Sequence, residues 1–146
     1  MISAGTAVLR TLALAFWFGG GLATFLATSI VFRMLSDRKA AGDLAGAILA
    51  RTSIVRNVAL VAVLVAVVLG DRGAGAAAGS ACVLLQGLAV GADLLTRRVR
   101  LEAGGTIEAL PPGDPRRRRF AALHGIAMLV LVLQVTVAGV GLALAS

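Results

Sequence analysis

The sequence contains one cysteine, one histidine, one tryptophan and no tyrosine among its 146 residues. A single cysteine, Cys82, excludes a disulfide within one chain and a metal cluster built on cysteine. One histidine, with no further His, Cys or Met at ligand spacing, is a weak basis for a zinc, copper or haem site. We therefore expect no bound metal and no cofactor.

Acidic residues are also scarce. Seven Asp and Glu stand against fourteen Lys and Arg, and the formal net charge is +7. In a soluble protein this excess would suggest a nucleic-acid partner. The chain has no nucleic-acid motif, however, and no aromatic residues interleaved with the basic ones. The positive charges lie in short segments beside apolar runs, where they orient a membrane protein and meet anionic lipid, so we expect no nucleic-acid partner.

Apolar residues are abundant. They make up 59% of the chain, and the mean hydropathy is +0.96. A soluble domain of this length could not bury so much apolar surface, because much of a small domain stays exposed. The 18 glycines fit the same class, since membrane helices use small residues to pack closely. The composition therefore predicts an integral membrane protein of one domain, residues 1–146.

Four long apolar segments predict an all-α, up-and-down bundle of four transmembrane helices. We place these helices at about residues 6–32, 38–69, 76–96 and 117–144. No charged residue lies between Thr11 and Phe32, and about 20 apolar residues suffice to cross a hydrocarbon core of about 30 Å. This run exceeds the ~7–15 residues of a signal-peptide core, which favours a retained first helix over a cleaved signal. The glycines 19–21 should stay helical and admit a neighbouring helix.

Several other residues have expected structural roles. Ser36 or Asp37 is a plausible N-cap of the second helix. Gln134, at mid-span in the fourth helix, should make a hydrogen bond between helices. Three pairs of glycines at four-residue spacing should make contacts within the chain; they are Gly42 with Gly46, Gly75 with Gly79, and Gly87 with Gly91.

Basic residues are concentrated in two connecting segments. At least ten Lys and Arg lie in or beside the segments after the first and third helices, whereas Arg10 and Arg72 lie on the other side. The positive-inside rule then predicts cytoplasmic basic loops and both termini on the non-cytoplasmic side. The preference for Arg over Lys is typical of GC-rich bacterial coding, which makes the cell inner membrane the expected location. Anionic lipids should contact Arg97, Arg98, Arg100, Arg116, Arg117, Arg118 and Arg119.

Three ionisable side chains fall inside the predicted spans at similar depth. With a rise of about 1.5 Å per residue, Arg56, Asp93 and His124 lie roughly 6–9 Å inside the basic ends of their helices. Thr28 and Ser29 of the first helix lie at a similar depth. Ionisable groups in lipid usually face the bundle interior and pair. We therefore expect a polar cluster near the cytoplasmic face, in which Asp93 pairs with Arg56 or His124.

This cluster has several alternative interpretations. Buried ion pairs often hold helices in register without any further role. A transport or ligand site and a metal site are the other two. Ser29, His124 and Asp93 also supply the residue types of a hydrolytic triad, but the chain has no nucleophile elbow on a strand. We expect no enzyme activity and name no catalytic residue.

Several short motifs resemble the transmembrane-protein-205-like family. They are Phe16-Trp17-Phe18-Gly19-Gly20, Val31-Phe32, Asp37-Arg38-Lys39-Ala40-Ala41-Gly42 and Phe120-Ala121-Ala122-Leu123-His124-Gly125. The matching positions are Trp17, Gly19, Asp37, Arg38, Gly42, Phe120 and His124. The resemblance covers nearly the whole chain and implies a four-helix membrane protein, whose bacterial relatives are filed as a domain of unknown function. It also implies export or trafficking of metal-containing or thiol-linked solutes, since the eukaryotic relative is associated with resistance to platinum drugs.

Together these observations predict a small inner-membrane protein with a transporter-like or ligand-binding role at the polar cluster. A homo-oligomer or a partner membrane protein is expected, because four short helices enclose little volume. The alternative is a structural or assembly subunit that packs against a larger membrane complex. A membrane enzyme or redox protein comes third.

Overall fold

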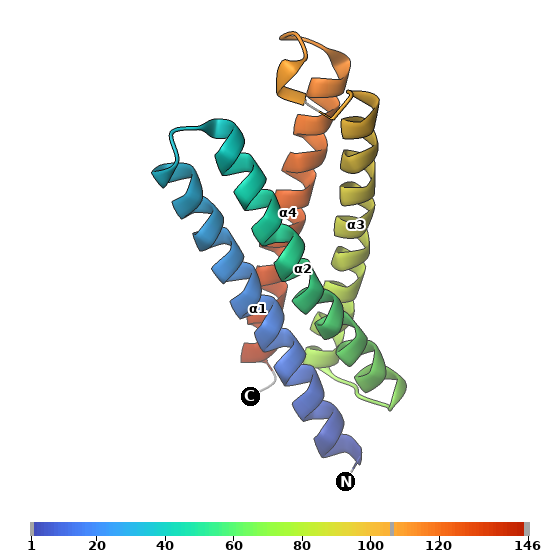
Figure 1. Ribbon diagram of the computed structural model, residues 1–146. Helices are drawn as coiled ribbons and strands as arrows, with labels where there is room; N and C mark the ends of the chain where they lie inside the picture. Colours follow the sequence, from blue (N-terminus) through green and yellow to red (C-terminus); the bar gives the residue numbers. More distant parts are fainter. Residues whose placement is uncertain (1, 106, 145–146) are drawn as a thin grey trace.

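The computed structural model describes residues 2–105 and 107–144, which form four long helices and one short 3-10 helix (Figure 1). Their bounds are Ile2–Met34 for α1, Arg38–Val68 for α2, Ala74–Glu102 for α3 and Pro115–Ala143 for α4, with η1 at Ile107–Ala109. Each of the four long helices is long and apolar enough to cross a membrane. The protein is therefore all-α, and its architecture indicates a multi-pass membrane protein.

The four helices run up and down and form two hairpins, α1 with α2 and α3 with α4 (Figure 1). The start of α1, the end of α4 and the turn at residues 69–73 lie at the same end of the bundle, where α1 projects beyond α4, and we call this the terminus end. The turn at residues 35–37 and the loop at 103–114 lie at the opposite, basic-loop end. The hairpins meet near the terminus end and diverge toward the basic-loop end (Figure 1).

The third helix extends beyond its expected end. It continues to Glu102, so that part of the expected loop is helical. Ion pairs one turn apart support this extension: Arg97 contacts Asp93 at 2.8 Å, and Arg98 contacts Glu102 at 3.2 Å. The helix ends where Gly105, at a positive φ of 92°, donates its N–H to the Arg100 carbonyl at 2.9 Å.

Aspartates begin two of the helices. Asp37 caps α2, as expected, because its Oδ1 accepts the N–H of Lys39 at 2.8 Å. Asp114 caps α4 in the same way and accepts the N–H of Arg116 at 2.8 Å. The Arg116 guanidinium also donates to Asp114 and holds the pKa of that carboxyl below its usual range. Both caps lie at the basic-loop end, where the chain turns between apolar spans.

The buried core lies in the half of the bundle nearest the terminus end. It is built from Ala13, Leu14, Trp17, Ala59, Val63, Cys82 and Ala138. In the other half, residues 115–129 of α4 include no fully buried side chain. The core therefore holds the two hairpins together where they meet. In the basic-loop half the hairpins diverge, and buried residues such as Ala41 of α2 and Val99 of α3 pack within their own hairpin.

The glycine-rich centre of α1 stays helical, as predicted. Only one of its three glycines admits a neighbour. A Cβ at Gly21 would clash with the Val135 side chain of α4, whereas Gly19 and Gly20 have no neighbour within 4 Å. Close approach through this segment is thus limited to one face, which α4 covers.

The expected contacts of the glycine pairs are found for one pair and are wrong for the other two. A Cβ on Gly79 would lie 2.9 Å from Val63 Cγ1, and one on Gly75 would lie 2.7 Å from Arg10 Nε. In the other two pairs, a Cβ added to any of the four glycines would have no neighbour within 4 Å; these are Gly42, Gly46, Gly87 and Gly91. The physical reason is the divergence of the hairpins, which brings glycines into contact only near the terminus end.

Replacing Gly79 by leucine should destabilise the bundle, because Val63 is only 1% exposed and cannot move aside. We expect a loss of about 1–3 kcal/mol in the free energy of unfolding, measured by titration with a denaturing detergent. Gly87→Leu on the same helix is the matched control, and it should cost no more than about 0.5 kcal/mol. Equal losses in the two variants would contradict the packing of α3 on α2 described here.

Candidate functional site

Three amide side chains connect α2, α3 and α4 across the middle of the bundle. Gln134 Nε2 donates to Gln86 Oε1 at 3.0 Å, and Gln86 Nε2 donates to Asn57 Oδ1 at 2.8 Å. Gln134 Nε2 also lies 3.3 Å from the Cys82 carbonyl oxygen. Gln86 and Gln134 are 2% and 1% exposed, so the chain of hydrogen bonds runs from the core to the exposed Asn57.

This amide chain confirms the expected interhelical hydrogen bond of Gln134, but Gln86 and Asn57 were not anticipated. A depth comparison would have found them. With a rise of about 1.5 Å per residue, all three lie roughly 13–18 Å from the terminus end of their helices. Buried amides at one depth in lipid can satisfy each other, and leaving them unpaired is costly. Gln134 Oε1 is the buried amide atom that still lacks a partner among the described residues.

A buried ion pair closes the terminus end. Arg10 Nη1 of α1 lies 2.8 Å and 2.9 Å from the two carboxylate oxygens of Asp71, which follows α2. The side chains are 10% and 7% exposed. Gly75 at the start of α3 makes room for the guanidinium, since any larger residue would meet Arg10 Nε. The pair therefore ties the start of α1 to the turn between the two hairpins.

The structure shows no hydrogen bond or ion pair between the described members of the polar cluster that was predicted near the basic-loop end. The Thr28 hydroxyl donates to the Thr24 carbonyl at 2.9 Å, and the Ser29 hydroxyl donates to the Leu26 carbonyl at 2.8 Å. Both hydroxyls are thus satisfied within their own helix. They offer acceptor oxygens but no free proton to a ligand.

The expected pairing of Asp93 with Arg56 or His124 is not formed. Asp93 Oδ2 lies 2.8 Å from Arg97 Nε, and the two side chains are 57% and 70% exposed. The carboxylate faces away from the bundle, so its nearest cation is the one a single turn along α3. Depth alone had placed Asp93 in the layer, but depth does not tell which way a helix face points.

Arg56 and His124 have different surroundings. Arg56 is partly buried, and its Nε has no hydrogen-bond partner among the described residues. His124 is exposed and lies parallel to Phe120, with ring centroids 6.5 Å apart. The Arg100 guanidinium lies 5.4 Å from the centre of the Phe120 ring. Arg100, Phe120 and His124 therefore form an exposed cationic and aromatic cluster at the basic-loop end.

The remaining positions of the family motif have structural roles or open surroundings. Trp17 is 1% exposed in the core, and its Nε1 has no partner among the described residues. Asp37 caps α2, whereas Gly19 and Gly42 have no neighbour within 4 Å. The side chain of Arg38 lies outside the described part of the structure. Whether these positions, or the five of the polar layer, bind anything stays a prediction.

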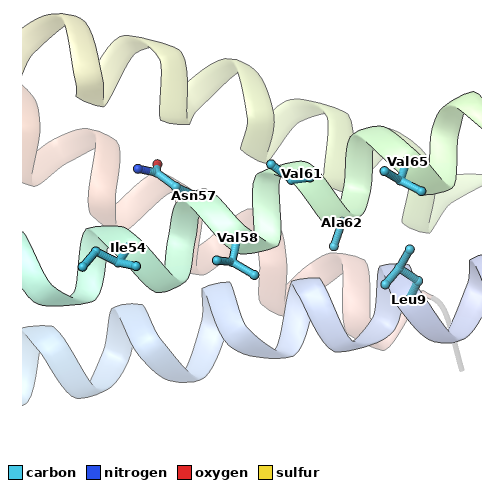
Figure 2. A pocket seen from close by; sticks show the side chains of 7 residues that line it. All are labelled: Leu9, Ile54, Asn57, Val58, Val61, Ala62 and Val65. Atoms are coloured by element: carbon cyan, nitrogen blue, oxygen red, sulfur yellow. The ribbon is translucent and has the colours of Figure 1, made fainter.

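The outer face of α2 carries a shallow groove of about 580 Å³ (Figure 2). Its lining consists of Leu9 from α1 and Ile54, Asn57, Val58, Val61, Ala62 and Val65 from α2. The lining is aliphatic except for Asn57, the last member of the amide chain. Within the described part of the chain, no three His, Cys, Asp or Glu side chains gather as metal ligands.

Removing one partner of the Arg10–Asp71 pair should destabilise the protein far more than removing an exposed one. We expect Asp71→Asn to cost about 3–5 kcal/mol, because it leaves a buried guanidinium without its countercharge. Asp93→Asn, which breaks the exposed pair with Arg97, is the control and should cost less than about 1 kcal/mol. Detergent-titration unfolding measures both losses, and equal effects would show that the Arg10 pair is not buried as described.

The sequence model of one family, described as "Domain of unknown function (DUF4149)", matches residues 12–101. The match covers residues 12–34 of α1, all of α2 and α3 up to residue 101, and it does not extend to α4. It agrees with the expectation of a domain of unknown function and does not support the narrower resemblance to the transmembrane-protein-205-like family. No curated protein and no solved structure matches the chain. Because this match covers more than half of the chain, the protein belongs to the DUF4149 family.

Proposed function

We propose that this protein is an assembly subunit of the membrane, whose bundle packs against another membrane protein chain. The observation that carries the proposal is the divergence of the two hairpins in the basic-loop half, which leaves the start of α4 and four glycines uncovered. Residues 115–129 of α4 include no fully buried side chain, and Gly42, Gly46, Gly87 and Gly91 have no neighbour within 4 Å. Glycine faces admit close helix contacts, which are the main source of helix association in lipid.

The polar side chains of the interior support the same proposal. The amides of Gln134 and Gln86 and the Arg10–Asp71 pair are engaged in holding helices to one another. Asp93 is paired on the surface. Few interior groups are therefore left to bind a solute, whereas a large outer surface is left to bind a neighbour.

The basic residues fit a subunit with its basic-loop end at a charged membrane surface. Arg100 and Phe120 form a cation–aromatic contact there, and Arg97, Arg98 and residues 116–119 add further positive charge. We propose anionic lipid headgroups as their partners and the cytoplasmic side of a bacterial inner membrane as their location.

An assembly subunit should occur in a complex larger than one chain. We expect cross-linking in the native membrane and mass spectrometry of the mildly solubilised protein to detect that complex. The double variant Gly42→Leu and Gly46→Leu should reduce the complex about tenfold without loss of bundle stability, since both positions are open. Gly5→Leu, also an open position, serves as the control. A protein that stays a single chain in both experiments would contradict the proposal.

One observation favours a ligand site as the second candidate. Arg56 Nε is buried near the middle of α2, next to Asn57, without a hydrogen-bond partner among the described residues. An anionic solute would supply that partner, in a transporter-like or ligand-binding role. The transport or trafficking implied by the family resemblance would use this position, while Thr28, Ser29 and His124 lie closer to the basic-loop ends of their helices.

Inorganic phosphate can serve as a probe of this second candidate. If Arg56 binds anions, phosphate should raise the thermal stability of the wild type, and Arg56→Gln should abolish the gain. Arg51→Gln, an exposed position on the same helix, should leave the gain unchanged. A stabilisation that survives in Arg56→Gln, or no stabilisation of the wild type, would exclude this site for simple anions.

A further inference from the structure

The outer face of α2 carries an uninterrupted heptad pattern, and its one hydrogen bond to another helix among the described residues is the one from Gln86 of α3 to Asn57. Positions separated by alternating steps of three and four residues share this face, as they do in the seam of a coiled coil. We call them the α2 seam: Ala47, Ala50, Ile54, Asn57, Val61, Leu64 and Val68. Every member is exposed. Three of them, Ile54, Asn57 and Val61, line the groove on this face (Figure 2).

Asn57 is the one polar residue of the α2 seam, and it lies deep in the expected membrane span. It lies eleven positions before Val68 at the end of α2, or roughly 16 Å at a rise of about 1.5 Å per residue. Its Oδ1 accepts from Gln86, but its Nδ2 makes no hydrogen bond to a described residue. At this depth lipid chains offer no acceptor, so an exposed amide N–H group is left unsatisfied.

We propose that the α2 seam is the interface with a second copy of this chain, forming a parallel two-fold dimer centred on Asn57. This inference rests on the proposed function and names the neighbouring chain. Two copies of one sequence insert in the same orientation, so their Asn57 side chains lie at the same depth. A carboxamide carries both donors and an acceptor with two lone pairs, so two asparagines can satisfy each other reciprocally.

The rest of the seam is equally self-complementary. A two-fold interface brings the same patch of both copies together, and here each copy offers the same aliphatic residues at the same heights. Ala47 and Ala50 are small and lie toward the basic-loop end, where they allow the two α2 helices to approach. Ile54, Val61, Leu64 and Val68 supply the larger knobs of the seam, and the groove beside Asn57 receives the side chains of the second copy.

Other occupants fit the seam less well. A lipid tail would fill the groove but would leave Asn57 Nδ2 without an acceptor. A different protein would need its own polar residue at this depth. A single asparagine in a seam is also the feature that selects register and oligomeric state in coiled coils.

Cysteine cross-linking of the full chain in membranes tests the dimer. The native Cys82 is fully buried and should not interfere. Val61→Cys and Ile54→Cys should each give an intermolecular disulfide on mild oxidation, because identical seam positions meet at a two-fold axis. Val55→Cys, exposed on another face of α2, is the matched control and should cross-link at least tenfold less. Equal cross-linking at all three positions, or none at the seam, would overturn the inference.

Asn57 itself is tested by the dissociation constant of the dimer in detergent. Asn57→Leu should weaken the dimer about 3- to 30-fold, the range of an interhelical hydrogen bond in membranes. Gln86→Leu is the control, because it breaks the same hydrogen bond within the chain but leaves Asn57 available to the second copy. Equal weakening by both variants would mean that Asn57 acts only within its own chain.

The outcomes separate this inference from the proposed function. A complex that persists while the seam positions fail to cross-link refutes the α2 dimer and leaves the assembly role standing. A single chain without any partner, in membranes and in detergent, refutes both.

Discussion

The fold depends on one constraint: inside a membrane, each polar side chain must find its partner within protein, because lipid offers none. Gln134 and Gln86 meet this demand by bonding each other across α4 and α3, and Asn57 extends the chain of hydrogen bonds to α2. The Arg10 guanidinium finds its partner in the Asp71 carboxylate. These contacts fix which helix faces meet, since apolar surfaces alone slide against one another in lipid at little cost.

The four helices could be predicted from the sequence because a helix that crosses the hydrocarbon core needs about 20 mostly apolar residues, and four such segments are present. The N-cap at Asp37 and the interhelical bond of Gln134 were predictable for similar reasons, since each depends on one residue type at one position. The polar layer was not, because residue counting gives the depth of Asp93 but not the direction in which its carboxylate points. Its rotation about the helix axis follows from how α3 packs, which the chain sets elsewhere, at Gly75 and Gly79.

Packing and polarity are unevenly distributed along the bundle. The terminus end has the core cluster around Trp17 and Cys82 and the buried ion pair, whereas the basic-loop end has open glycines and exposed charge. A bundle held at one end can accommodate neighbours of different shape at the other without losing its own fold.

The ion pair between Arg10 and Asp71 joins residues that are 61 positions apart in the chain. Because a chain is synthesised from its N-terminus, Arg10 has no Asp71 to pair with until α2 and the turn that follows it have been made. The ion pair therefore links the first helix to the last residues needed to complete the turn into the second hairpin.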